Sequence, residues 1–284
     1  MYELQDHAVL ASPAYVARLN APSPWSTRMM PLHRNMVRTQ CRVLLSQGGV
    51  TGRHILTIRC APEPGRADAM VDGPLGKMLS TRLADKGIVV LGFFDLGFRN
   101  VTNSKRPILK GEDLDGLKLR VIPNPVFIET FKTFKANAVP MPFAELYGAL
   151  ENKAVDGQEN PYAVILSSKL YEVNKFVSET NHVYATNPIQ ISKRFWEKLT
   201  PAEQKLLQDA ATEAQNYQRV ASREVSSKAV AELKAKGMVH NEIPAAEQAR
   251  MRAAVKAVHD KFAAAYEPAV VNLFRTELER VSKL

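Results

Sequence analysis

The run LKLRVIPNPVFIETFKTFK, residues 117–135, decides the fold class. Its first part, Leu117 to Val121, is predicted to form a strand, and its second part, Pro125 to Lys135, a helix. The same alternation continues downstream, with a helix over Phe143–Asn152, a strand over Val155–Gln158 and a helix over Pro161–Lys169. Alternating strands and helices are typical of an α/β protein.

Upstream of this run, Ala67–Lys86 is predicted to be helical with an interruption at Asp72–Pro74. The apolar stretch Ile88–Phe94 has the character of a buried strand. Downstream, a strand is expected over Met238–Ile243, followed by two helices from Ala245 to the C-terminus.

A long helix is expected between residues 200 and 236. Thr200-Pro-Ala-Glu203 is a capping box with proline at the first helical position, and Gly237 supplies the stop. At 1.5 Å per residue the helix is about 50 Å long, enough to bridge two lobes. Its continuous apolar stripe comprises Leu206, Leu207, Ala210, Ala214, Tyr217, Ala221, Val225, Ala229 and Leu233.

Composition excludes several classes of protein. The chain has 284 residues, of which 45% are hydrophobic and 24% charged, as in an ordinary globular protein of two domains or one large divided domain. The longest apolar run, Gly87–Phe94, is far shorter than the roughly 18 residues of a membrane-spanning helix. Two cysteines without a C-x-x-C spacing predict neither a disulfide framework nor a zinc site.

The net charge of +9 does not indicate a nucleic-acid partner, because it is concentrated at one end of the chain. Residues 1–66 hold eight Arg, no Lys and only three acidic residues. No long basic stripe interleaved with aromatic residues is present. We therefore expect no nucleic-acid binding.

Residues 1–66 differ from the rest of the chain in more than charge. They are interrupted by prolines, begin with the acidic run Met1-Tyr-Glu-Leu-Gln-Asp6 and show no sustained periodicity. One interpretation is a loop-rich extension. The other, which we favour, is a segment translated in the wrong frame or from a false start. It predicts that another frame upstream of the Ala67 codon encodes a secretory signal followed by regular α/β periodicity.

Catalytic signatures are missing from the sequence. It contains no G-x-S-x-G elbow, phosphate loop, dinucleotide fingerprint or H-E-x-x-H motif. His182 and Glu159 could form an acid/base pair, but a single histidine after a strand is more often structural, and nothing orients a nucleophile toward it. The pattern favours a protein that is not an enzyme.

Two Asn-Pro pairs indicate possible anion sites. In each pair, Asn124-Pro125 and Asn160-Pro161, the asparagine is predicted to cap a helix that starts at the proline. The free N–H groups of such a helix would face the carboxyl end of the preceding strand, where α/β proteins bind anions. Arg120 at the end of its strand could add a bidentate fork for a carboxylate. The alternative is that both asparagines only cap helices.

Several runs, in this order and spacing, resemble the DctP-type solute-binding proteins of tripartite ATP-independent periplasmic (TRAP) transporters. The resemblance covers about residues 67–284, and its most specific part is Val155-Asp-Gly-Gln-Glu-Asn160-Pro161. The other runs are Val71–Pro74, Gly97–Ser104, Asp115–Val121, Val139–Leu150, Lys169–Val173 and Thr180–His182.

The resemblance implies a two-lobed α/β architecture of the periplasmic-binding-protein type II, with the long helix spanning both lobes. Lobe one would comprise residues 67–98 and 186–225, and lobe two residues 99–185 and 226–284. Residues 1–66 match nothing in the family, so the N-terminal part of lobe one is expected to be atypical or missing.

The resemblance also implies a function and a site. A receptor of this kind binds an organic acid anion in the periplasm and passes it to the membrane subunits of the transporter, as a monomer, without cofactor or metal. Arg120 would form the salt bridge to the ligand carboxylate and Asn160 would donate to the same group. Arg99, Phe143 and Asn124 complete the expected site, Phe143 by packing on the ligand. The alternatives are an enzyme acting on a small carboxylate and a truncated or frameshifted member without function.

Overall fold

The computed structural model describes residues 64–284. The predictions for residues 1–66 therefore fall almost entirely outside the described part of the chain. The described residues divide into two units, one with residues 78–95 and 187–221 and the other with residues 64–77, 96–186 and 222–284. Two strands and two helices contribute residues to both units. The lobe boundaries inferred from the resemblance stay a prediction.

The strands of the described chain form a mixed sheet, which confirms the α/β prediction. Its order is β3-β2-β4-β1-β5-β6, with β2 parallel to β3 and β4, β1 antiparallel to β4, and β5 parallel to β6. The strands are β1 (Ile88–Asn103), β2 (Lys118–Val121), β3 (Asn137–Pro140), β4 (Gly157–Pro161), β5 (Phe176–Ser192) and β6 (Val239–Glu242).

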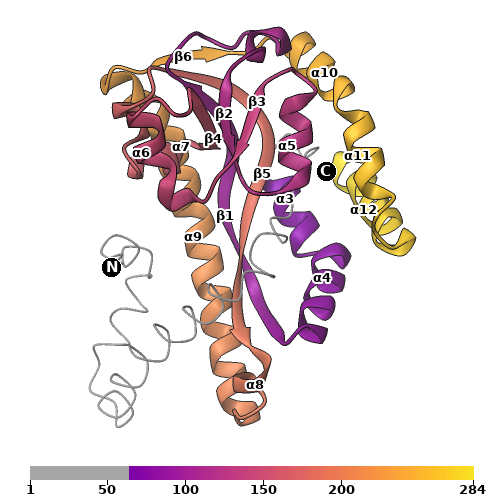
Figure 1. The fold of residues 1–284 in the computed structure, drawn as a ribbon. Helices are drawn as coiled ribbons and strands as arrows, with labels where there is room; N and C mark the ends of the chain where they lie inside the picture. The colour runs from indigo at the N-terminus through magenta and orange to yellow at the C-terminus, as the bar shows by residue number, and fades with distance from the viewer. Residues whose placement is uncertain (1–63) are drawn as a thin grey trace, which may run out of the picture. The chain divides into compact units, whose positions relative to one another are not determined.

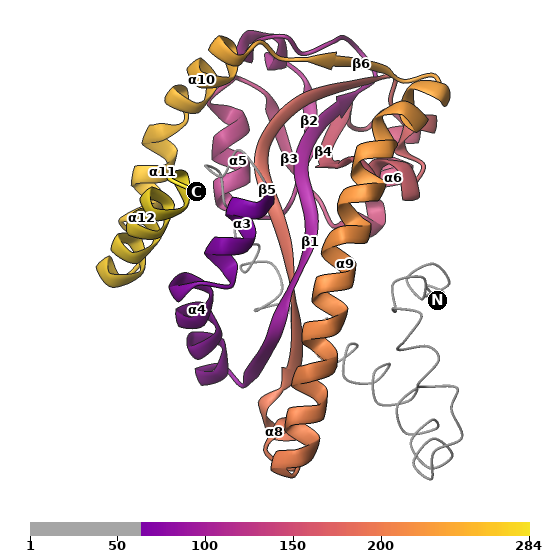
Figure 2. The ribbon, with the colours of Figure 1, turned by 180° about the vertical axis from the view of Figure 1, so that it is seen from behind.

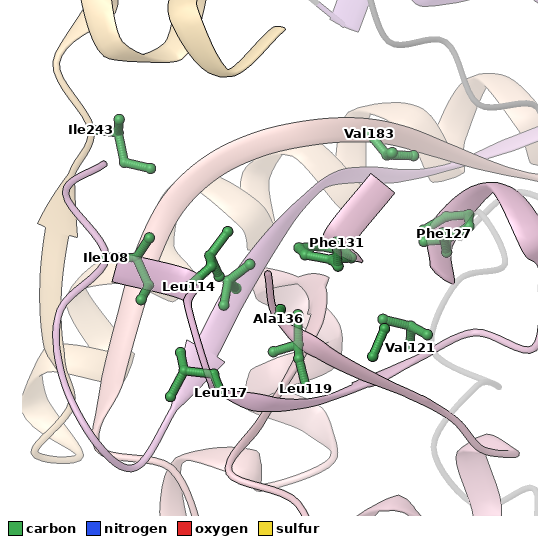
Figure 3. Packing of buried hydrophobic residues seen from close by; sticks show 12 residues of the cluster. Ile108, Leu114, Leu117, Leu119, Val121, Phe127, Phe131, Ala136, Val183 and Ile243 are labelled. Carbon is green, nitrogen blue, oxygen red and sulfur yellow. The ribbon is translucent and has the colours of Figure 1, made fainter. Parts of the chain in front are cut away.

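In the second unit, helices cover β2, β3 and β4 on both faces (Figures 1 and 2). Helix α5 (Pro125–Lys132) lies on one face, where Phe127 and Phe131 pack with Leu119 and Val101 in a buried cluster (Figure 3). Helices α6 (Leu146–Glu151) and α7 (Tyr162–Ser167) lie on the other face, over a second cluster. That cluster includes Leu146, Leu150, Ile165 and Val177.

The first helices of the described residues follow the sequence prediction. Helix α3 (Pro64–Val71) and helix α4 (Pro74–Asp85) are separated at Asp72 and Gly73, as the Asp-Gly-Pro interruption indicated.

Short helical segments connect the longer elements of the described chain. They are the 3-10 turns η2 (Gly111–Leu114), η3 (Phe143–Glu145) and η4 (Leu170–Glu172) and the short helix α8 (Lys193–Trp196).

The C-terminal prediction of two helices is wrong, because three are present. They are α10 (Ala245–Ala254), α11 (Lys256–Ala263) and α12 (Pro268–Ser282). The chain leaves helical geometry at Val255, which is fully buried, and Pro268 starts α12 at a position that suits its fixed φ.

The long helix α9 (Pro201–Ala235) begins with the predicted capping box. Glu203 Oε2 accepts from the Thr200 backbone N–H at 2.8 Å, and Thr200 Oγ1 accepts from the Glu203 N–H at 3.3 Å. The helix ends just before Gly237, whose φ of +92° favours glycine.

The predicted apolar stripe of α9 is wrong at Leu206 and Val225, which are 68% and 45% exposed. Within the first unit, glutamines make the contact between α9 and β1 instead. Gln208 Nε2 donates to Leu91 O at 2.7 Å, and Gln215 Oε1 accepts from Phe93 N at 2.6 Å. Gln218 both accepts from Asp95 N and donates to Asp95 O, at 2.8 and 2.7 Å. The strand backbone is thus bonded by polar side chains of the helix.

Candidate functional site

Three of the five predicted site residues lie on neighbouring strands of the second unit. Arg120 is on β2, Asn160 on β4 and Arg99 on β1. All three are buried, although each carries a polar or charged side chain. Buried polar groups of this kind need partners, and their partners decide what the site can do.

Strand register assigns these residues to opposite faces of the sheet. Residues directly paired on neighbouring strands point to the same face, and successive residues alternate. Asn100 pairs with Asn160 and Arg99 with Pro161, so Arg99 and Asn160 face opposite ways. Leu119 pairs with Gly157, which puts the next residue, Arg120, on the face of Asn160. Arg120 and Asn160 therefore share a face, and Arg99 lies on the other.

The Arg99 guanidinium is bound to Glu159. Its Nε donates to Glu159 Oε2 at 2.5 Å, and its Nη2 donates to Glu159 Oε1 at 2.8 Å and to the Glu159 carbonyl at 2.5 Å. The Glu159 side chain is fully buried. This fork-to-fork pairing satisfies both charges inside the protein.

His182 on β5 completes a buried triad with this ion pair. Its Nε2 lies 3.0 Å from Glu159 Oε2 and its Nδ1 2.8 Å from Thr180 Oγ1, while its ring stands edge-on to Phe131. Burial alone would raise the pKa of Glu159, but the charge of Arg99 and the bonds from His182 and Arg99 hold it well below its usual range. His182 and Glu159, which the sequence suggested as a possible pair, are therefore in hydrogen-bond contact, and Arg99 is the third member of the group.

Arg120 has a different environment. Its Nε donates to the carbonyl of Met141 at 2.8 Å, and its guanidinium carbon lies 5.9 Å from the ring centroid of Phe143. Within residues 64–284, neither of its two Nη atoms has a hydrogen-bond acceptor. Burial lowers the pKa of Arg120 to about 10, with Glu159 opposing and Arg99 adding to that shift, so the group stays charged at neutral pH.

Phe143 lies in η3, beside Arg120, with 48% of its surface exposed. A half-exposed aromatic ring next to a buried cation can cover the apolar side of a bound molecule while the cation holds its charged group.

The prediction that Asn160 caps a helix is wrong. Asn160 is a strand residue of β4, and Pro161 occupies the N-cap of α7 without any side-chain cap. The Asn160 amide Nδ2 instead donates to Gln158 Oε1 at 2.5 Å. Pairing with β1 keeps the chain extended through Pro161, so the helix starts one residue too late for Asn160 to reach its first turn.

The corresponding prediction for Asn124 is confirmed. Its Oδ1 accepts from Val126 N at 2.9 Å at the start of α5, and Pro125 occupies the first turn. Asn124 is thus a helix cap, whatever further contact it makes.

Gln158 is a residue of the site that the sequence reasoning did not single out. It is fully buried and bonds directly to Asn160. The run Asp156-Gly-Gln-Glu-Asn160 could have indicated Gln158, because residues two apart on a strand share a face and Gln158 is two residues before Asn160. A Cβ at Gly157 would lie 2.2 Å from the carbonyl of Thr102, so only glycine lets β4 begin this close to β1.

The model of the family described as bacterial extracellular solute-binding protein, family 7 (DctP), matches residues 63–265. The chain belongs to this family. Its fold is that of the TRAP periplasmic solute-binding proteins. The structure of the sugar acid binding protein of Advenella mimigardefordensis, solved with galactonate, superposes with a TM-score of 0.75. The two sequences are 37% identical, and the match covers 78% of this chain and 71% of that one. A TRAP solute-binding protein of Ochrobactrum anthropi has a TM-score of 0.73 and 42% identity, covering 81% and 71%.

Curated relatives agree with this family assignment. A solute-binding protein of Verminephrobacter eiseniae is 38% identical over 214 residues, 75% of this chain and 63% of the relative. The 2,3-diketo-L-gulonate-binding periplasmic protein of Escherichia coli is 40% identical over 176 residues, 62% of this chain and 54% of the relative. This chain therefore spans less than two thirds of the length of either relative.

Among the described helices, none combines the length and the apolar character needed to cross a membrane.

Proposed function

We propose that this chain is an extracytoplasmic solute receptor that binds an organic acid anion for TRAP-type transport. The observation that carries the proposal is the environment of Arg120. A buried guanidinium whose Nε is satisfied by a neutral carbonyl, and whose two Nη atoms lack an acceptor in residues 64–284, favours an incoming anion. The two oxygens of a carboxylate match the two Nη atoms in geometry and charge.

The other predicted residues complete the proposed site. Asn160, on the same face as Arg120, donates to the carboxylate, and Phe143 packs on the body of the ligand. Arg99 lies on the opposite face, where its Nε and Nη2 bind Glu159, so we expect it to hold the strands of the site in place, and Asn124 fixes the first turn of α5.

The proposed solute class is sugar acids and related small carboxylates. The Escherichia coli relative is named for 2,3-diketo-L-gulonate, and the Advenella structure holds galactonate. A TRAP protein of Polaromonas, 37% identical, was solved with D-erythronate. These ligands share a carboxylate and a hydroxylated chain, which suit a buried arginine and neighbouring amides.

We further propose that the chain works in the periplasm as a monomer, with the small and large membrane subunits of a TRAP transporter as partners and without nucleic acid. The family is one of bacterial extracellular solute-binding proteins, and the solved relatives are TRAP periplasmic solute-binding proteins, which supports both the partners and the compartment. It is a family of receptors rather than enzymes, which speaks against the small-carboxylate enzyme as the alternative.

Thermal-shift measurements followed by calorimetry test the proposal on the full chain. The panel contains galactonate, D-erythronate, galacturonate and glucuronate, with galactitol and galactose as uncharged controls. We expect stabilisation by at least one acid, none by the controls, and no product after prolonged incubation. Equal response to acids and neutral sugars, or turnover of an acid, would contradict the receptor. A folded chain that binds no acid would support the non-functional alternative.

A further inference from the structure

Asn160 stands at one end of a chain of buried side-chain hydrogen bonds. Its Nδ2 donates to Gln158 Oε1, and Gln158 Nε2 donates to Thr102 Oγ1 at 2.8 Å. The Thr102 hydroxyl donates to Asn174 Oδ1 at 2.6 Å. Gln158, Thr102 and Asn174 are all buried, so water does not compete for these bonds.

The direction of every bond in this chain is fixed at its far end. Asn174 Nδ2 lies 2.9 Å from the carbonyl of Val173 and 3.2 Å from the carbonyl of Asp156. A backbone carbonyl can only accept, so this end of the Asn174 amide must be the NH₂ group. Its Oδ1 must then accept from Thr102, whose oxygen is left to accept from Gln158.

The fixed direction of these bonds extends to the candidate ligand site. Because Gln158 uses its NH₂ group on Thr102, it presents its carbonyl oxygen to Asn160. Asn160 must therefore turn its own NH₂ group toward Gln158. A flipped Asn160 would set two carbonyl oxygens against each other in a buried position, which costs the desolvation of both.

We propose that Gln158 is a positioning residue that, through the polarity set by Thr102 and Asn174, holds the Asn160 amide in one orientation. In that orientation one N–H of Asn160 is used by Gln158, and the second N–H and Oδ1, which have no hydrogen-bond partner within residues 64–284, are available to a ligand. The benefit for ligand binding rests on the function proposed above. It consists of an amide that is already oriented before the acid arrives.

A binding experiment tests this role from two residues away. Thr102→Val removes the hydroxyl at nearly constant volume, and Thr102→Ser is the matched control that keeps it. We expect Thr102→Val to weaken binding of the tightest acid of the panel about tenfold and Thr102→Ser to change it less than about twofold. Gln158→Leu should act like Thr102→Val.

A double-mutant cycle separates positioning from general damage. If Thr102 acts through Asn160, Thr102→Val should change affinity less than about twofold in an Asn160→Ala background. An equal loss in both backgrounds would overturn the proposal, because a purely structural effect does not depend on Asn160.

A measurement without ligand keeps this proposal distinct from the receptor function. The signals of the Asn160 side-chain N–H that bonds to Gln158, identified by their loss in Asn160→Ala, should exchange slowly with solvent in the wild type and in Thr102→Ser. They should exchange at least about tenfold faster in Thr102→Val, since the orienting bond is weakened. Equal exchange in all three overturns the proposal. Slow exchange with this difference, but no acid binding, supports the orientation of Asn160 and refutes the receptor function.

Discussion

The two arginines of the sheet, Arg99 and Arg120, are both buried but differ in what neutralises them. Arg99 makes three hydrogen bonds to Glu159 on its own face. Within residues 64–284, Arg120 makes a single hydrogen bond, to the neutral carbonyl of Met141, and its guanidinium lies beside the ring of Phe143. An external anion gains more at Arg120, because no carboxylate of residues 64–284 is hydrogen-bonded to it.

Replacement of Arg120 should therefore weaken ligand binding. We expect Arg120→Ala to cost about 2–5 kcal/mol of binding free energy, as for the loss of one member of a buried charge pair. Arg120→Lys should recover only part of it, because an ammonium group cannot reproduce the two parallel N–H donors. Calorimetry with the tightest acid of the panel measures both effects.

Arg250→Ala is the control for this change. Arg250 is a half-exposed arginine of α10 that pairs with Glu112 and Glu247, so its loss changes the net charge equally without touching the site. Affinity that falls equally in Arg250→Ala and Arg120→Ala would show a general charge effect and contradict the assignment of Arg120.

Asn160→Asp is predicted to damage both binding and stability. A carboxylate at this position cannot donate to Gln158 Oε1 and would also repel a bound acid. We expect complete loss of measurable binding and about 1–3 kcal/mol of lost folding stability. Asn124→Asp is the matched control and should leave stability nearly unchanged, because aspartate caps a helix as well as asparagine does. A melting temperature of Asn160→Asp equal to that of the wild type would mean that the bond from Asn160 to Gln158 does not contribute to folding stability.

Among the helices and strands, features that depend on local sequence were predictable, whereas the pairing of distant segments was not. The Asn124 cap and the Thr200 capping box depend on bonds within a few residues, and both are present. The strand predicted at Ile88–Phe94 continues to Asn103, because polar residues such as Asn100 and Thr102 find buried partners distant in sequence. Periodicity cannot reveal such partners, and for the same reason the Asn160 prediction failed.

The capping box makes a prediction for α9. Thr200→Ala removes the oxygen that accepts from Glu203 N and should cost about 1 kcal/mol of stability. Thr200→Ser keeps that oxygen and should cost only a fraction of this. Urea unfolding followed by circular dichroism compares the two variants. Equal stability of both would show that the box contributes nothing to α9.

The buried triad of Arg99, Glu159 and His182 links the folding stability of the protein to pH. The pKa of Glu159 is lower in the folded protein than its ordinary value of 4.5. Such a group contributes stability that is complete above about pH 4.5 and is lost as the pH falls toward the folded pKa of about 2. We therefore expect the melting temperature to fall steeply across this interval.

Glu159→Gln tests the source of that dependence. It should lower stability at pH 7 by about 3–5 kcal/mol, because Arg99 is left buried without its carboxylate. The melting temperature of this variant should also change less with pH between pH 4.5 and 2 than that of the wild type. Glu112→Gln, at an exposed ion pair with Arg250, is the comparison. An equally steep acid transition in Glu159→Gln would place the titrating group elsewhere.

The glutamines of α9 have a consequence for the behaviour of the chain in a crowded solution. The segment IVVLGFF, residues 88–94, has the β-propensity, absence of charge and absence of proline that characterise segments prone to amyloid-like stacking. Gln208, Gln215 and Gln218 occupy main-chain groups of Leu91, Phe93 and Asp95 that a foreign strand would otherwise bind. We therefore expect α9 to protect this strand from pairing with another chain, with side-chain amides in place of a neighbouring strand.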